Sequence, residues 1–105
     1  MSDSFTDDEA PEIPDGGFLR SLPIINKRGL HARASAKFVQ MVERFSCTVT
    51  VTRAGETVGG RSIMGLLTLG AAQGTSIYVT AVGEDAQAAL DAIDELLATR
   101  FGEDE

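Results

Sequence analysis

The spacing of apolar residues predicts the first two elements of the chain. Residues 18–26, FLRSLPIIN, are typical of a strand, and their proline favours a sheet edge because proline donates no ladder hydrogen bond. From Ala34 onward, apolar residues recur at spacings of three and four, which predicts an amphipathic helix. The members of this first stripe are Ala34, Phe38, Met41, Val42 and Phe45.

Strict alternation follows in residues 47–53, CTVTVTR, and predicts a half-buried strand with Cys47, Val49 and Val51 on one face. A turn at residues 54–56 leads into a short strand at residues 57–61, so the two strands form a hairpin. Ser62 then fits the N-cap of a short helix over residues 63–69 that ends at Gly70.

The last third of the chain predicts one more strand, at residues 75–83, and the most regular helical stripe. That stripe consists of Ala86, Ala89, Leu90, Ile93, Leu96, Leu97 and Phe101. The order is therefore β-α-β-β-α-β-α. Because each strand has one apolar face and each helix one apolar stripe, we expect a two-layer α+β sandwich with helices on one side of an antiparallel sheet.

Length and composition indicate one domain with tails. At 105 residues the chain has the length of a single domain, which we place at residues 18–102. Residues 1–17 combine acidic residues, Pro and Gly, and we expect a disordered tail there; residues 103–105 form an acidic C-terminal end. A domain this small has little room for a bulky cofactor, and we expect none.

Charge and cysteine content narrow the partners and the compartment. The formal net charge of −7 disfavours nucleic acid and anionic membranes as partners. A single cysteine excludes an intrachain disulfide framework and fits a reducing compartment. The acidic N-terminus does not resemble a signal peptide, and no apolar run approaches the length that spans a membrane. We therefore expect a cytoplasmic protein.

His31, the one histidine in the chain, stands where the first helix is expected to begin. The first turn of a helix leaves N–H groups without partners and carries partial positive charge, so it suits an anion. We expect Gly29 to remove bulk beside the ring, Leu30 to anchor the turn, and Arg33 to bind oxyanions. Neutral imidazole is a competent nucleophile, so this arrangement favours reversible phosphoryl transfer on either ring nitrogen.

Other functions for His31 have less support. A plain surface or capping histidine is the simplest alternative. A zinc site needs more ligands than one His and one Cys, so we expect no metal. A hydrolase using His31 as nucleophile lacks a visible second catalytic group, and no nucleophile elbow is present.

Two motifs resemble those of HPr, the histidine-containing phosphocarrier protein of the phosphoenolpyruvate-dependent phosphotransferase system. They are GLHARASAKFV at residues 29–39 and GRSIMGLLTLGAAQGT at residues 60–75, and the likeness runs from about Arg20 to Phe101. The resemblance implies an open-faced sandwich of four strands and three helices. It also implies that His31 accepts a phosphoryl group from Enzyme I and passes it to a histidine of an Enzyme II A domain, with Arg33 stabilising the group. The family usually has Pro where this chain has Ala34.

The second motif implies regulation and docking. Ser62 matches a serine that is phosphorylated in many family members, which would require a serine kinase or phosphorylase; its simpler role is to cap the short helix. The resemblance favours Ile63, Met64 and Leu67 as a partner-docking patch next to His31. A regulatory binding module controlled at Ser62 is the alternative function. We expect a monomer, because a carrier must keep its reactive face free.

Overall fold

The computed structural model describes residues 10–105, and the first nine residues of the expected acidic tail lie outside this range. Residues 10–16 lead into the sheet without forming a helix or strand. The elements, in chain order, are β1 (Gly17–Pro23), α1 (Ala32–Val42), β2 (Thr48–Arg53), β3 (Glu56–Gly59), α2 (Ile63–Thr68), β4 (Ser76–Val82), α3 (Ala86–Ala98) and a single 3-10 turn (Arg100–Gly102).

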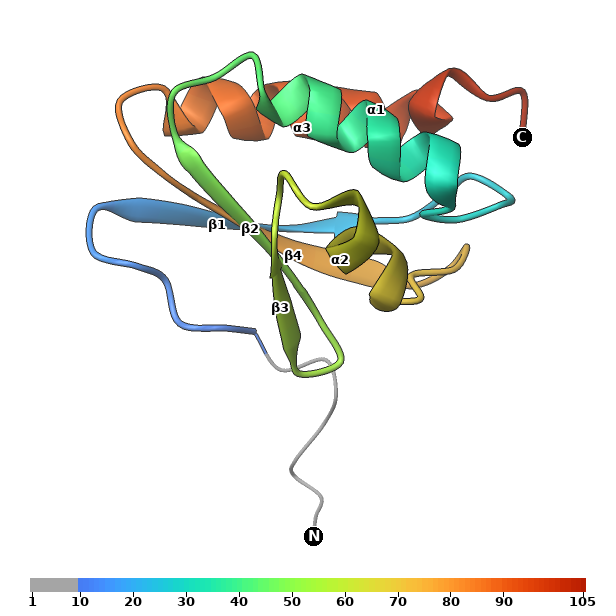
Figure 1. The fold of residues 1–105 in the computed structure, drawn as a ribbon, viewed down its shortest axis with the longest axis horizontal. Coiled ribbons are helices and arrows are strands. Elements are labelled where there is room, and N and C mark those ends of the chain that lie inside the picture. The colour runs from blue at the N-terminus through green and yellow to red at the C-terminus, as the bar shows by residue number, and fades with distance from the viewer. Residues whose placement is uncertain (1–9) are drawn as a thin grey trace, which may run out of the picture.

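The four strands form one antiparallel sheet in the order β1-β4-β2-β3. The predicted order of strands and helices is confirmed, and so is the two-layer α+β class. β1 lies at an edge of the sheet, as Pro23 at its end predicts. Figure 1 shows the helices on one side of the sheet, with α1 and α3 side by side.

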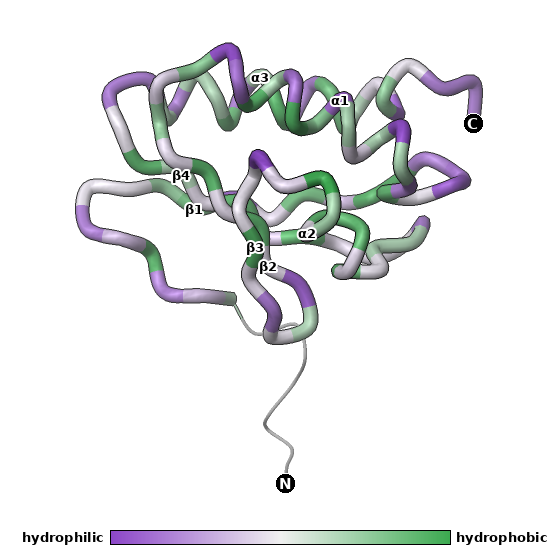
Figure 2. The backbone as a smooth tube through the Cα atoms, in the orientation of Figure 1, coloured by the Kyte–Doolittle hydropathy of each residue, from purple (hydrophilic) through white to green (hydrophobic). Residues whose placement is uncertain are grey.

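The core lies between the helices and the sheet. Phe38 and Val42 of α1 and Ile93 of α3 are fully buried. Each of them lies one or two helical turns from other buried residues of its own helix. The sheet meets them with Val51 and Val79, which are paired across β2 and β4. Figure 2 shows the resulting alternation of hydrophobic and hydrophilic positions along the chain. Burial of this apolar surface fixes the position at which α1 begins, and therefore the position of His31.

Two residues of the predicted helical stripes lie outside the helices. Phe45 follows the end of α1 and is half-buried, whereas Phe101 follows α3 and is fully buried with a φ of 55°. Predicting them as helical was wrong, although both do pack against the core. Apolar spacing indicates which side chains are buried, but it does not show at which residue the helix ends. A chain that turns after its last helical residue can still place the next aromatic side chain in the core.

No helix among residues 10–105 is long and apolar enough to cross a membrane.

Candidate functional site

His31 is the N-cap residue of α1. Its backbone is extended, with φ −77° and ψ −175°, and its carbonyl accepts the hydrogen bond from the Ser35 N–H at 2.8 Å that opens the helix. The imidazole caps no N–H group. Within the described residues, nothing accepts a hydrogen bond from the N–H groups of residues 32–34. The first turn therefore keeps its donors and its partial positive charge available beside the ring.

The loop before α1 is held against the loop that follows α2. The Leu30 N–H donates to the Ala71 carbonyl at 2.9 Å, and the Leu30 side chain is buried. Gly29 has a φ of +69°, and a Cβ there would lie 2.6 Å from the Ala71 oxygen. We expected Gly29 to make room beside the imidazole. The structure shows that it makes room for the Ala71 and Ala72 backbone, which fixes the approach of the chain to His31.

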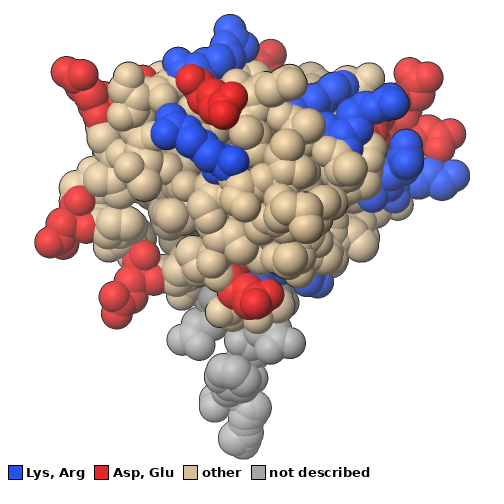
Figure 3. Space-filling model, viewed as in Figure 1, with Lys and Arg blue, Asp and Glu red and all other residues tan. Residues whose placement is uncertain are grey.

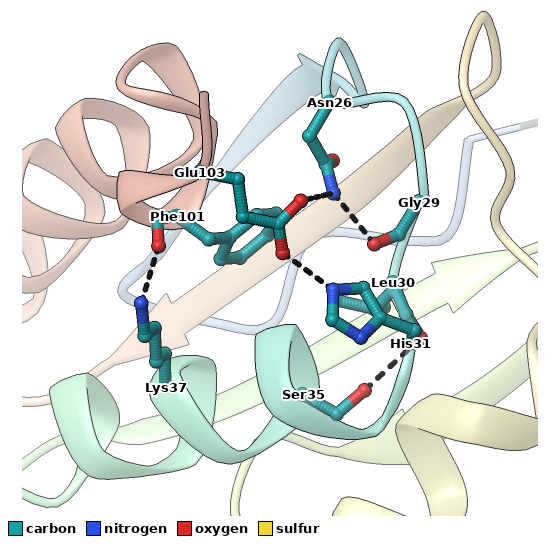
Figure 4. Close-up of polar contacts among 8 residues, drawn as sticks. All are labelled: Asn26, Gly29, Leu30, His31, Ser35, Lys37, Phe101 and Glu103. Atoms are coloured by element: carbon teal, nitrogen blue, oxygen red, sulfur yellow. Dashed lines mark hydrogen bonds and ion pairs between the residues drawn. The ribbon is translucent and has the colours of Figure 1, made fainter. Parts of the chain in front are cut away.

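The imidazole contacts a carboxylate from the far end of the chain. His31 Nε2 is hydrogen-bonded to Glu103 Oε2, as Figure 4 shows. The two side chains are 17% and 16% exposed, so the pair is largely covered but still partly accessible to solvent. Nothing in the local sequence around His31 predicts this contact, because 72 positions separate the two residues.

Asn26 holds the same carboxylate from its other side. Its Nδ2 donates to Glu103 Oε1 at 3.0 Å and to the Gly29 carbonyl at 2.8 Å, and the residue is fully buried. The opposite amide orientation would place Oδ1 against two oxygens, so these contacts fix how the amide lies. The hydrogen bond from His31 is the main reason why the pKa of Glu103 lies below the ordinary carboxyl value; partial burial opposes this effect and Asn26 adds to it.

A tight turn after α3 brings Glu103 to this position. Arg100 and Phe101 both have left-handed backbones, with φ of 58° and 55°, which cost about 1–2 kcal/mol each for residues with a Cβ. Burial of the Phe101 ring, worth roughly 1.5–3 kcal/mol, offsets much of that cost. Lys37 of α1 then donates to the Phe101 carbonyl at 2.6 Å. The C-terminal segment is thus fastened to α1 one residue before Gly102 turns it toward His31.

The basic residues near His31 have different partners. Lys27 pairs with Glu105 at 3.3 Å, and Lys37 is engaged by the Phe101 carbonyl. Arg33 is exposed, and its guanidinium has no hydrogen-bond or ion-pair partner in the described part of the chain. Figure 3 shows basic and acidic side chains gathered together at the edge where α1 begins and the chain ends. Of the predicted site residues, Arg33 therefore remains the free cation at this helix start.

α2 presents the second motif beside the same site. Ser62 is its N-cap and accepts a hydrogen bond from the Gly65 N–H at 2.9 Å, which confirms the predicted cap. Ile63 and Met64 are 39% and 71% exposed, while Leu67 is half-buried. A surface cleft of about 270 Å³ joins α2 to the histidine. Residues from both sides line this cleft, among them Arg28, Leu30, His31, Leu67 and Gly70.

Other reactive groups lie away from His31. Cys47 is buried just before β2 begins, and burial together with nearby Asp85 raises the pKa of its thiol, so it stays protonated and unreactive. In residues 10–105, no three His, Cys, Asp or Glu side chains lie close enough together to hold a metal ion. Within the described residues, the reactive groups at this edge are therefore the His31 imidazole with the Glu103 carboxylate beside it, the Arg33 guanidinium and the start of α1.

The chain is similar to known proteins over most of its length. Residues 19–99 match the family described as PTS HPr component phosphorylation site. The phosphocarrier protein HPr of Xylella fastidiosa is 47% identical over 83 residues, which are 79% of this chain and 93% of that protein. The crystal structure of HPr from Thermoanaerobacter tengcongensis has a TM-score of 0.80 at 38% identity, covering 84% of this chain and 99% of that one. A crystal structure of an HPr dimer from the same organism has a TM-score of 0.66 at 40% identity, covering 78% and 94%.

Proposed function

Because the chain belongs to the HPr family of phosphocarrier proteins, we propose that His31 is the residue that carries the phosphoryl group. Family members are components of the phosphotransferase system, and they relay the group rather than catalyse a reaction of their own. In the proposed relay, Enzyme I donates the phosphoryl group to His31, and a histidine of an Enzyme II A domain receives it.

The observation that carries this proposal is the position of His31 at a helix start whose donors are free. Three successive N–H groups, those of residues 32–34, have no acceptor among the described residues. A phosphoryl group on the imidazole would meet these donors and the partial charge of the helix end. Arg33 adds a guanidinium that has no partner of its own and can form two parallel hydrogen bonds to phosphoryl oxygens.

Ala34 bears on how well this helix start works. The residue is fully buried in the first turn of α1, so its methyl group packs in the core. Unlike the proline usual in the family, Ala34 keeps its N–H and supplies one of the three free donors. The substitution therefore leaves the proposed anion site with one more donor and with a backbone that is less restricted in φ.

We assign docking to Ile63, Met64 and Leu67, which we call the α2 patch. Exposed apolar side chains beside a reactive group suit transient protein partners, which bury a small area and separate quickly. The cleft between Leu67 and His31 makes this patch continuous with the site of transfer. Met64 is flexible and can adapt to partners of different shape.

Regulation at Ser62 is part of the proposal. The residue is exposed and directly precedes the α2 patch, so a serine kinase could reach it. A phosphate there would place about two negative charges next to the docking surface and weaken the binding of partners. A binding module controlled only at Ser62 is the alternative function. The free Arg33 and the free helix donors beside His31 favour the carrier, because a binding module has no use for them.

The proposed setting is the cytoplasm, where the single cysteine stays reduced, and the proposed partners are proteins. We propose that the carrier works as a monomer, because dimerisation through the α2 patch would cover the site. The Thermoanaerobacter tengcongensis protein has been crystallised as a dimer. Sedimentation at the concentrations used for transfer tests the oligomeric state of this chain, and we expect a monomer.

The deciding experiment is phosphorylation by Enzyme I and phosphoenolpyruvate. We expect an acid-labile adduct on the native chain, no adduct on His31→Ala, and a normal adduct on Ser62→Ala. Ser62→Ala is the matched control because it removes a hydroxyl at the neighbouring helix start without touching the imidazole. Labelling that persists in His31→Ala would defeat the assignment.

A further inference from the structure

A second cleft lies at the end of the sheet where β2 ends and β4 begins. Its volume is about 350 Å³, at the small end of the range for clefts that bind small molecules. Ser21 of β1 and Tyr78 of β4, which are paired across the sheet, both line it. The other lining residues are Arg53, Gly74, Thr75 and Ser76. Because it shares no lining residue with the cleft at His31, a ligand bound here would occupy a separate site.

The lining of this cleft combines hydroxyl groups with one positive charge. Ser21 and Ser76 are exposed, and their hydroxyls have no hydrogen-bond partner in the described part of the chain. The Thr75 hydroxyl donates to the Ala72 carbonyl at 2.7 Å, so its oxygen can still accept a hydrogen bond. None of the described residues that line the cleft is acidic, although the whole chain has a net charge of −7.

Arg53 supplies the charge, and it has more donors than partners. Its Nη1 donates to the Leu69 carbonyl at 2.9 Å, which fixes the guanidinium against the end of α2. The Nε is buried without a hydrogen-bond partner, and Arg53 forms no ion pair within residues 10–105, not even with Glu56 opposite it in the β2–β3 hairpin. An unpaired buried N–H is costly, and a guanidinium is suited to bind an oxyanion through two parallel hydrogen bonds. An oxyanion in the cleft would supply the missing acceptor for this cation.

The loop that carries Thr75 into the cleft is held by backbone hydrogen bonds. The Gly74 N–H donates to the Ile24 carbonyl at 2.9 Å, and the Ile24 N–H donates to the Thr75 carbonyl at 2.8 Å. The Thr75 N–H donates to the Ala72 carbonyl at 3.0 Å. Since these bonds tie the loop to the residue that follows β1, the cleft is formed before a ligand arrives, which lowers the ordering cost of binding.

We propose that this cleft binds a small oxyanion that carries hydroxyl groups, with Arg53 holding the anionic group and Ser21 and Ser76 holding the hydroxyls. A phosphorylated sugar and a sugar acid share this chemistry. Inorganic phosphate alone would leave the serine hydroxyls unpaired, and a neutral sugar would leave Arg53 unpaired. The inference does not depend on the proposed role of His31.

The test is a titration of the full chain, followed in ¹H–¹⁵N amide spectra, with ribose 5-phosphate, ribonate, ribose and inorganic phosphate as separate probes. We expect saturable binding of ribose 5-phosphate or ribonate, with shifts centred on Ser21, Gly74 and Ser76. The tighter of the two shows whether the site takes a phosphate or a carboxylate. Ribose and inorganic phosphate should bind at least about tenfold more weakly, because each lacks one set of hydrogen bonds.

The location of the shifts separates this site from the start of α1. His31→Ala should bind the preferred probe with native affinity, even if Enzyme I fails to label the native chain. Shifts confined to residues 31–34 would place the anion at the helix start and overturn the inference. The absence of saturable binding, or equal affinity for ribose and for both anionic sugars, would overturn it as well.

Substitutions in the cleft test the assigned contacts. Arg53→Met should weaken binding of the preferred probe about 10- to 100-fold, the effect of losing charge-assisted hydrogen bonds, and Arg53→Lys should recover part of this loss. Ser76→Ala removes an exposed hydroxyl without a partner, and should weaken binding severalfold. Glu56→Gln is the matched control, because Glu56 is opposite Arg53 in the hairpin but does not line the cleft, and it should bind no more weakly than the native chain. Native affinity in Arg53→Met, or in Ser76→Ala if the Arg53 variants do not fold, would overturn the inference.

Discussion

Gly29 is the residue whose replacement tests most sharply how the loop before α1 positions His31. In Gly29→Ala, the new Cβ would lie 2.6 Å from the Ala71 oxygen and 2.9 Å from the Ala72 Cα. Both are backbone atoms, so no side chain can rotate away. The Leu30 N–H donates to the same Ala71 carbonyl at 2.9 Å, so the loop cannot recede without stretching this hydrogen bond.

Three contributions set the size of the effect. A left-handed backbone with a Cβ costs about 1–2 kcal/mol. Displacement of the packed neighbouring backbone adds roughly 1–3 kcal/mol. Weakening of the bond between Leu30 and Ala71 adds up to about 1 kcal/mol. These contributions are not additive, because a small shift of the loop relieves more than one of them at once. We therefore expect a loss of roughly 2–4 kcal/mol in the free energy of unfolding.

The assay is urea unfolding followed by circular dichroism, since the chain has no tryptophan. Gly55→Ala is the matched control: Gly55 has a φ of +81°, but a Cβ there meets no atom within 4 Å, so only the backbone cost of about 1–2 kcal/mol applies. Gly29→Ala should also be phosphorylated more slowly, and Gly55→Ala at the native rate. Equal stability of the two variants, within about 0.5 kcal/mol, would refute the close-contact explanation.

Four further changes test other parts of the site. Arg33→Ala should slow transfer from Enzyme I about 100-fold, the effect of losing one preorganised donor, with unfolding in urea unchanged because the side chain is exposed and unpartnered. Ser62→Ala should lose about 1 kcal/mol of stability with the cap, whereas Ser62→Asp should keep the cap and slow transfer severalfold; equal rates in both would contradict regulation through charge. Met64→Ala should raise the KM of the chain as a substrate of Enzyme I and leave the stability unchanged, because the side chain is 71% exposed. Ile13→Ala should alter neither the KM nor the stability. The His31 hydrogen bond lowers the pKa of Glu103, so the ionised carboxylate stabilises the fold at pH values above the ordinary glutamate pKa and loses this effect as the pH falls through the lowered pKa. The loss of unfolding free energy in Glu103→Gln should therefore become smaller on acidification, and a loss that does not change with pH would contradict this expectation.

Local patterns were sufficient for most of the fold. The alternation in residues 47–53 and the spacing of Ala34 and Phe38 predict which side chains face the core, and these side chains are buried in the structure. The end of α3 could not be predicted in this way. Phe101 continues the apolar spacing, but the preceding Arg100 already has a left-handed backbone, which no periodicity reveals.

The site was predictable only in part, for the same reason. The helix start at His31, the nearby Arg33 and the cap at Ser62 all follow from short-range rules about helix ends. The contacts of Glu103 with His31 and Asn26 join residues more than 70 positions apart and depend on how the C-terminal turn packs on α1. A glutamate that follows Phe and Gly at the end of a helix carries no sequence signal of its partner.

The central claim is that the first turn of α1 holds the phosphoryl group on His31. The most direct measurement compares ¹H–¹⁵N amide spectra of the chain before and after phosphorylation by Enzyme I. We predict large downfield shifts for the N–H groups of Ala32, Arg33 and Ala34, because donors that now lack an acceptor would bind phosphoryl oxygens. A phosphorylated chain in which these three amides keep their positions would contradict the claim.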